Sequence, residues 1–320
     1  MGYKRAGCEV IAANDIDPEM AYHYKLNIKP KHYFLAPIRD LLTQDLPKEL
    51  FGIDILDGSP PCSTFSLAGN REKDWGKKKH FKEGQSTQVL SDLFFDYLDL
   101  VGHLKPKVAI AENVKGMIVG NAKGYAKLVM ARFKELGYRP QLFLLNAASC
   151  GVPQRRERVF FCALRNDITA PALKIICQTS WISTGEATKD LQTLTKNEKK
   201  DTEFTSNTHK AWWPMTNPGE DYGIATERFG PVKCWNMKKL SNNKPSNTLP
   251  ASHKNITHWG EPRHLTFREY KRLGSFPDDY QAKTDNIGKY MVGMSVPPKM
   301  TEAVARAVID QWLLSKEAHT

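Results

Sequence analysis

The stretch IDILDGSPPC, residues 53–62, is a short apolar run followed by turn-forming residues. Ile53–Leu56 predicts a buried strand, and Gly58–Pro61 ends it, because glycine and proline interrupt regular structure. A similar apolar run, Val108–Ala111, follows a stretch with helical spacing at Thr87–Leu104. Buried strands that alternate with helices are typical of a mostly parallel sheet with helices on both faces. The stretch therefore places the chain in the α/β class.

The same alternation extends to both sides of this stretch. The other elements predicted from apolar spacing are strands at Cys8–Ala13, Leu142–Leu145 and Val159–Leu164 and helices at Pro18–Leu26 and Tyr125–Leu136. Together they predict one large sheet domain over residues 1–165.

The remainder of the chain has a different composition. Residues 166–262 are rich in Thr, Asn, Lys, Trp and Pro without a sustained period, which predicts a smaller, irregular domain. Within it, the charged stretch Lys196–Thr202 is predicted to be a solvated loop. Helical spacing returns at Leu265–Phe276 and Thr301–Leu314. Residues 263–320 are therefore predicted to be a hinge helix and a return to the first domain.

Composition narrows the class of partner. The 320 residues include 46 Lys and Arg against 35 Asp and Glu, a formal net charge of +11. This excess favours a polyanion such as nucleic acid, although a basic surface without a role is the plain alternative. No apolar run predicts a membrane span, and residues 1–20 lack the apolar core of a secretory signal. The six cysteines are far apart and include no CxxC pair, a spacing that is not typical of a structural metal site or of a disulfide scaffold. Because free thiols are typical of a reducing compartment, we expect a cytoplasmic protein.

Polar residues follow three of the predicted strands. Asp15 follows the first strand, Cys62 the second and Glu112 the third. Because ligands of an open parallel sheet bind beyond the carboxyl ends of its strands, these residues predict a ligand site. Each of these three residues alone could have a purely structural role. A cysteine, for example, is often an inert core residue. The loop Gln154–Arg158 adds a cationic segment or, alternatively, a solvated charge run.

Five blocks resemble, in the same order, conserved blocks of the cytosine-C5 DNA methyltransferases of bacteria and phages. They are GSPPCSTFS at 58–66, ENV at 112–114, QRRER at 154–158, RHLTFRE at 263–269 and GMSVPP at 293–298. The resemblance implies an S-adenosylmethionine-dependent, Rossmann-like methyltransferase fold. Residues 1–165 would then form the catalytic and cofactor domain, and residues 166–262 the target-recognition domain.

The resemblance implies methyl transfer from S-adenosylmethionine to carbon 5 of a flipped-out cytosine in a specific DNA sequence. Cys62 would add to carbon 6 of the base, which makes carbon 5 nucleophilic. Glu112 would bind or protonate ring N3, and Arg158 would hold O2. Arg156 would support the pocket, and no metal would take part.

The resemblance also assigns residues to the cofactor and to the nucleic acid. Asp15 matches a carboxylate that binds the ribose hydroxyls, and Ile16 matches a residue that stacks on adenine. Pro61, Leu93 and Ser295 match other cofactor-lining positions, and Ser63 and Thr248 match nucleic-acid contacts. We expect double-stranded DNA as substrate, a monomeric protein, and a cognate restriction endonuclease as partner.

The sequence departs from the family at its N-terminus. The family opens with a strand and a Phe-x-Gly-x-Gly loop, whereas residues 1–7 resemble the helix after that loop. We therefore expect a chain truncated before this block, whose activity by itself is open to test. In addition, Pro37 stands where the family has an aspartate near adenine, and Met294 replaces an asparagine.

Three other functions stay open on this basis. A tRNA-modifying cytosine methyltransferase would keep Cys62, Glu112 and Arg158, but it would not need a recognition segment as long as residues 166–262. If the cofactor loop were lacking, the chain would be a DNA-binding protein without catalytic activity. A nucleotide-dependent enzyme of another doubly wound class is disfavoured, because the sequence has no GxGxxG motif.

Overall fold

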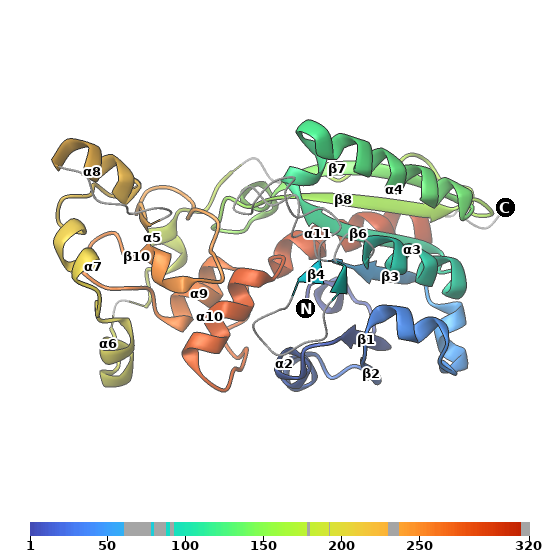
Figure 1. Ribbon diagram of the computed structural model, residues 1–320, viewed down its shortest axis with the longest axis horizontal. Helices are drawn as coiled ribbons and strands as arrows, with labels where there is room; N and C mark the ends of the chain where they lie inside the picture. The colour runs from blue at the N-terminus through green and yellow to red at the C-terminus, as the bar shows by residue number, and fades with distance from the viewer. Residues whose placement is uncertain are drawn as a thin grey trace. The chain divides into compact units, whose positions relative to one another are not determined.

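Figure 1 shows the computed structural model, which describes residues 1–60, 78–79, 88–89, 93–177, 180–191, 193–229 and 237–314. The chain forms two compact units. The helical unit comprises residues 1–6, 146–156 and 177–303, and the sheet unit comprises residues 7–145, 157–176 and 304–320. The predicted division at residues 165 and 262 into catalytic, recognition and hinge parts stays a prediction.

The sheet unit contains most of the strands. Their bounds are β1 Ala12–Asp15, β2 His32–Leu35, β3 Ile55–Gly58, β4 Lys78–Lys79, β5 Gln88–Val89, β6 Val108–Val114, β7 Tyr138–Asn146 and β8 Glu157–Arg165. The largest sheet has the order β3-β6-β8-β7, while β1 pairs with β2 and β4 with β5. The pairs β1–β2 and β3–β6 are parallel, and β8 is antiparallel to β6. The predicted α/β class is confirmed.

The longer helices of this unit are α2 Pro18–Ile28, α3 Leu93–Leu104 and α4 Lys123–Glu135. Helix α11 Pro298–Val308 enters this unit at Val304 and runs on into a π-helical turn at Ile309–Leu313. The start of α2 and the end of α4 carry recognisable sequence signals. Asp17 caps α2 by accepting hydrogen bonds from the amides of Glu19 and Met20. Gly137, at φ 85°, ends the turn after α4 in the left-handed region that favours glycine.

The core of the sheet unit is built on β6, whose residues Val108–Ala111 are fully buried. One face of the sheet packs against α3 and α4, which lie along it in Figure 1. Phe94 of α3 and Tyr125 of α4 meet edge to face above Phe161 of β8. Because β6 is covered on both faces, its sequence is a continuous apolar run rather than an alternating one.

Tyr97 fastens α3 to two neighbouring strands. Its single hydroxyl proton is shared between the carbonyls of Leu56, at 3.0 Å, and Ile110, at 2.8 Å. The ring lies so close to β3 that a Cβ atom on Gly58 would be 2.5 Å from two of its carbons. Gly58 is therefore required by this close approach.

The helical unit is made of short elements. They are α1 Gly2–Arg5, α5 Thr184–Ala187, α6 Lys196–Thr202, α7 Asn207–Trp212, α8 Tyr222–Phe229, α9 Phe267–Leu273, α10 Asp285–Met294, β9 Lys238–Lys239 and β10 Ile256–Thr257. The predicted solvated loop at Lys196–Thr202 is wrong, because this stretch is α6. A capping box starts the helix: Thr195 accepts from the Glu198 amide, and Glu198 accepts from the Thr195 amide.

Across the described residues, the helices are all too short or too polar to cross a membrane.

We predict that Gly58→Ala lowers the free energy of unfolding by about 1–3 kcal/mol, because the new methyl group would overpack the ring of Tyr97. Gly52→Ala is the matched control, since no atom lies within 4 Å of the added Cβ there. Urea denaturation followed by circular dichroism measures both variants. Equal stability of the two would contradict the close packing at Gly58.

Candidate active site

Glu112 and Arg158 form an ion pair on adjacent strands. In the antiparallel register of β6 and β8, Glu112 lies opposite Phe160 and Val114 lies opposite Arg158. Glu112 and Arg158 are thus diagonal neighbours on one face, within reach of a long side chain. Arg158 Nε lies 2.9 Å from Glu112 Oε1, and the two side chains are 15% and 9% exposed. The structure therefore brings together two of the predicted catalytic residues.

The environment of this pair is largely dry. Burial lowers the pKa of Arg158, although the neighbouring Glu112 carboxylate opposes this effect. Arg158 Nη1 also donates to the Glu157 carbonyl at 2.7 Å, which fixes the plane of the guanidinium. A carboxylate beside a planar donor group can bind a flat heterocycle that presents both a donor and an acceptor on one edge.

Asn113 connects the end of β6 to the loop that leads to Cys62. Its Nδ2 donates to the Pro60 carbonyl at 3.1 Å, and its Oδ1 accepts from the Val114 amide at 2.8 Å. Asn113 is 4% exposed, so this contact is shielded from water. Asn113 belongs to the ENV motif at 112–114, but the motif by itself assigns no role to this side chain. Cys62, with Pro61 and Ser63, lies outside the described residues.

Two of the predicted cofactor residues lie at the carboxyl end of β1. Asp15 is exposed there, and its Oδ1 accepts a hydrogen bond from the Asp17 amide at 3.0 Å. Ile16 is half-buried beside it. Leu93, the first residue of α3, is buried in the core. The described residues include no group of three or more side chains able to hold a metal ion.

The other predicted site residues belong to the helical unit, where the Gln154–Arg156 loop holds residues 248–249. Thr248 Oγ1 donates to the Arg155 carbonyl at 2.7 Å, and Gln154 Oε1 accepts from the Leu249 amide at 3.2 Å. Arg156 Nη1 donates to the Leu249 carbonyl at 3.2 Å. The structure thus joins Arg156 and Thr248 through backbone contacts.

Arg156 also reaches the segment that carries Ser295. Its Nη2 donates to the Met294 carbonyl at 3.4 Å, one residue before Ser295 at the C-terminal end of α10. Ser295 Oγ donates to the Met291 carbonyl at 2.7 Å. Since Arg156 is 3% exposed, these contacts identify it as a buried support of the segments around it.

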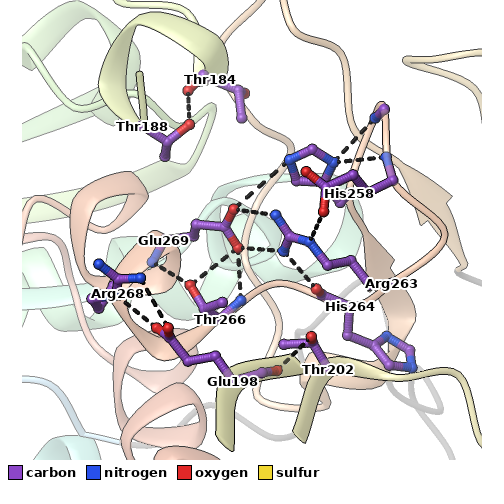
Figure 2. Close-up of polar contacts among 12 residues, drawn as sticks. Thr184, Thr188, Glu198, Thr202, His258, Arg263, His264, Thr266, Arg268 and Glu269 are labelled. Atoms are coloured by element: carbon purple, nitrogen blue, oxygen red, sulfur yellow. Dashed lines mark hydrogen bonds and ion pairs between the residues drawn. The ribbon is translucent and has the colours of Figure 1, made fainter. Parts of the chain in front are cut away.

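A buried ion pair that sequence reasoning missed organises the helical unit. Figure 2 shows Arg263 and Glu269 joined by two hydrogen bonds. Each bond is 2.9 Å long, and the two side chains are 8% and 3% exposed. Glu269 Oε2 also accepts from the Thr266 amide at 2.7 Å and so caps α9. Both residues belong to the block RHLTFRE, in which the spacing Thr-x-x-Glu is the sequence signature of a capping box.

His258 lies against this pair and is held neutral. Its Nδ1 accepts hydrogen bonds from the amides of Gly260, at 3.1 Å, and Glu261, at 3.0 Å. Burial and the neighbouring Arg263 lower the pKa of His258 to about 4. The ring therefore acts as an acceptor at neutral pH and fixes the turn before Arg263.

A family comparison identifies the chain. The family model described as C-5 cytosine-specific DNA methylase matches residues 1–310. The chain belongs to this family. The predicted family and the enzyme class of this methylase, a DNA (cytosine-5) methyltransferase, are confirmed.

Curated relatives of the methylase agree with this assignment. Type II methyltransferase M.NgoPII of Neisseria gonorrhoeae is 27% identical, and the match covers 96% of the methylase and 91% of the relative. Type II methyltransferase M.DdeI of Desulfomicrobium norvegicum is 28% identical, and the match covers 96% of the methylase and 85% of the relative.

Solved structures support the fold. The methylase resembles a protein described as a DNA modification methyltransferase encoded within an Escherichia coli prophage, with a TM-score of 0.72, 18% identity and coverage of 97% and 94%. Spodoptera frugiperda DNMT2, as a triple mutant, gives a TM-score of 0.65 at 18% identity, with coverage of 96% and 95%. The predicted methyltransferase fold is thereby confirmed.

We predict that Glu269→Gln lowers the free energy of unfolding by about 3 kcal/mol or more, because it leaves the buried Arg263 charge with only the half-exposed Glu261 carboxylate as its partner. Glu261→Gln is the matched control. Its carboxylate pairs with the same arginine, but its side chain is 45% exposed, so the loss is expected to stay below about 1 kcal/mol. Denaturant unfolding of both variants measures the difference. Equal losses of unfolding free energy would contradict a larger contribution of the buried pair to stability.

Proposed function

We propose that this methylase transfers a methyl group to carbon 5 of a cytosine turned out of double-stranded DNA, through a covalent bond between the base and Cys62. The observation that carries the proposal is the ion pair of Glu112 and Arg158 at the end of β6. Asn113 ties this end to Pro60, two residues before Cys62 in the chain. The pair and the start of the cysteine loop therefore share one edge of the sheet.

The side chains at this edge match the needs of a pyrimidine. Addition of the Cys62 thiolate to carbon 6 forms a C–S bond and moves electron density toward N3 and O2 of the ring. Glu112 must carry a proton to act here: the protonated carboxyl donates to N3, and Arg158 donates to O2, so both stabilise the developing charge. Carbon 5 then acts as the nucleophile. Loss of its proton to a base and departure of the Cys62 sulfur restore the aromatic ring.

The family is dependent on S-adenosylmethionine, which supplies the methyl group when it is bound. The exposed Asp15 carboxylate at the end of β1 suits the hydroxyls of a ribose, and half-buried Ile16 offers an apolar surface to an adenine ring. Pro61, Leu93 and Ser295 complete the set of residues that we assign to the cofactor.

Double-stranded DNA as substrate agrees with the charge of the chain. A net charge of +11 favours a polyanion and predicts an affinity that falls with salt. Turning the base out of the duplex costs a few kcal/mol, which contacts to the flanking strand must offset. We assign such contacts to Ser63 and to exposed Thr248, whose segment Arg156 holds in place.

The names of the curated relatives suggest a biological setting. M.NgoPII and M.DdeI are both named type II methyltransferases. We infer that this methylase acts as a monomer beside a restriction endonuclease that reads the same DNA sequence.

We predict that Cys62→Ser abolishes methyl transfer, because a hydroxyl is a far weaker nucleophile than a thiolate. Transfer of labelled methyl groups from S-adenosylmethionine to unmethylated genomic DNA measures it, and Cys8→Ser is the matched control with full activity. Wild-type protein is also expected to form a covalent complex with DNA that contains 5-fluorocytosine.

Two outcomes of this experiment would overturn the proposal. Methylation by Cys62→Ser at the wild-type rate would remove the thiol from the reaction. Labelling of tRNA in place of duplex DNA would assign the protein to an RNA-modifying branch.

We predict that Glu112→Gln lowers the rate of methyl transfer by about 10²–10³, because the amide stabilises the charge at N3 less well. DNA affinity is expected to change by less than a few-fold, since the effect arises in the transition state. Glu157→Gln is the matched control: its side chain is 44% exposed and pairs with Lys115 rather than with Arg158. Single-turnover kinetics and DNA titration separate the two effects, and a wild-type rate for Glu112→Gln would exclude this residue from the mechanism.

A further inference from the structure

We propose that Cys150 and Cys177 form a reversible disulfide that fastens the segment beginning at Cys177 to the Gln154–Arg156 loop. Both residues belong to the helical unit. Their sulfur atoms lie 2.7 Å apart, and both are free, partly exposed thiols. Since a disulfide bond measures about 2.05 Å, the sulfurs need to approach by only about 0.7 Å.

The two cysteines stand where a bond would join two segments that already touch. Cys150 ends a short 3-10 helix at Ala147–Cys150, and Gly151, at φ 74°, turns the chain into the Gln154–Arg156 loop. Four residues after Cys177, the ring of Trp181 packs under the guanidinium of Arg155, 4.9 Å from its centroid. A disulfide would add a covalent contact beside this cation–π contact.

The effect of the bond on stability follows from the path of the chain between the two cysteines. After Arg156 the chain leaves the helical unit, forms β8 and the following residues to 176 in the sheet unit, and returns at Cys177. A Cys150–Cys177 bond therefore closes a loop that contains the whole excursion. Closing such a loop restricts the unfolded chain and stabilises the folded one.

The Cys150–Cys177 pair differs from the other described cysteines, because each of its thiols has a second thiol as a hydrogen-bond partner. This hydrogen bond lowers the pKa of the thiol that accepts it. Burial raises the pKa of Cys8, and it raises that of fully buried Cys162 further. A thiol with a lowered pKa supplies more thiolate, which is the reactive form.

The oxidant that we assign is a small-molecule disulfide such as oxidised glutathione. The thiolate of either cysteine, for example Cys177, attacks one of its sulfurs, forms a mixed disulfide and releases one glutathione thiolate. Cys150, once deprotonated, attacks the Cys177 sulfur and releases the second glutathione. Two cysteine thiols are oxidised, one glutathione disulfide is reduced to two thiols, and the protons pass to these thiols. Excess dithiol reductant reverses both steps.

The experiment treats the full chain with oxidised glutathione, blocks remaining thiols, and maps non-reduced peptides by mass spectrometry. We expect a linked peptide that joins Cys150 to Cys177 and is two hydrogen masses lighter than its two parts. The thermal midpoint is expected to rise by about 4 °C or more, and to return after dithiothreitol.

Variants separate this pair from general thiol oxidation. Cys150→Ser and Cys177→Ser should each lose the oxidant-dependent rise in midpoint, whereas Cys8→Ser should keep it. Recovery of the two cysteines of wild-type protein as separate glutathione adducts, or linked to other cysteines, would overturn the pairing. A Cys150–Cys177 link without a change in midpoint would overturn the fastening role.

Discussion

The site depends on the register of β6 between β3 and β8. Parallel pairing places Gly58 of β3 beside Ala111, and antiparallel pairing places Phe160 of β8 beside Glu112. Side chains alternate between the faces of a strand, so a slip of one residue would move Glu112 to the other face. Complete burial of Val108–Ala111 excludes this slip, because it would disturb the packing on both faces.

The sequence was sufficient to predict the polar residue at the end of β6, but not its partner. An apolar run followed by Glu112 indicates a strand with a carboxylate at its end. The pairing with Arg158 depends on the antiparallel direction of β8 and on its register, and both result from long-range packing. The motif could assign Arg158 to the base, but only the strand register shows why its guanidinium lies beside this carboxylate.

The prediction of a loop at α6 was wrong because it relied on local charge and could not include a long-range contact. Lys196–Thr202 has no apolar residue, so its composition indicates a solvated loop. The capping box of Thr195 and Glu198 starts a helix nevertheless, and Arg268 of α9 donates to both oxygens of Glu198, at 2.6 and 2.9 Å (Figure 2). The cap was visible in the sequence, whereas the contact with α9 could only be found in the folded chain.

Short helices explain why the helical unit places charged side chains in its interior. A helix of seven residues such as α9 is not stable alone, because nucleation costs more than so few hydrogen bonds return. Glu269 caps α9 and binds Arg263 through both oxygens, so one carboxylate fixes the start of the helix and the segment before it. An apolar pair of similar volume would give comparable stability but no preferred orientation. The geometry of the Arg263–Glu269 pair thus fixes the start of α9 relative to the segment before it.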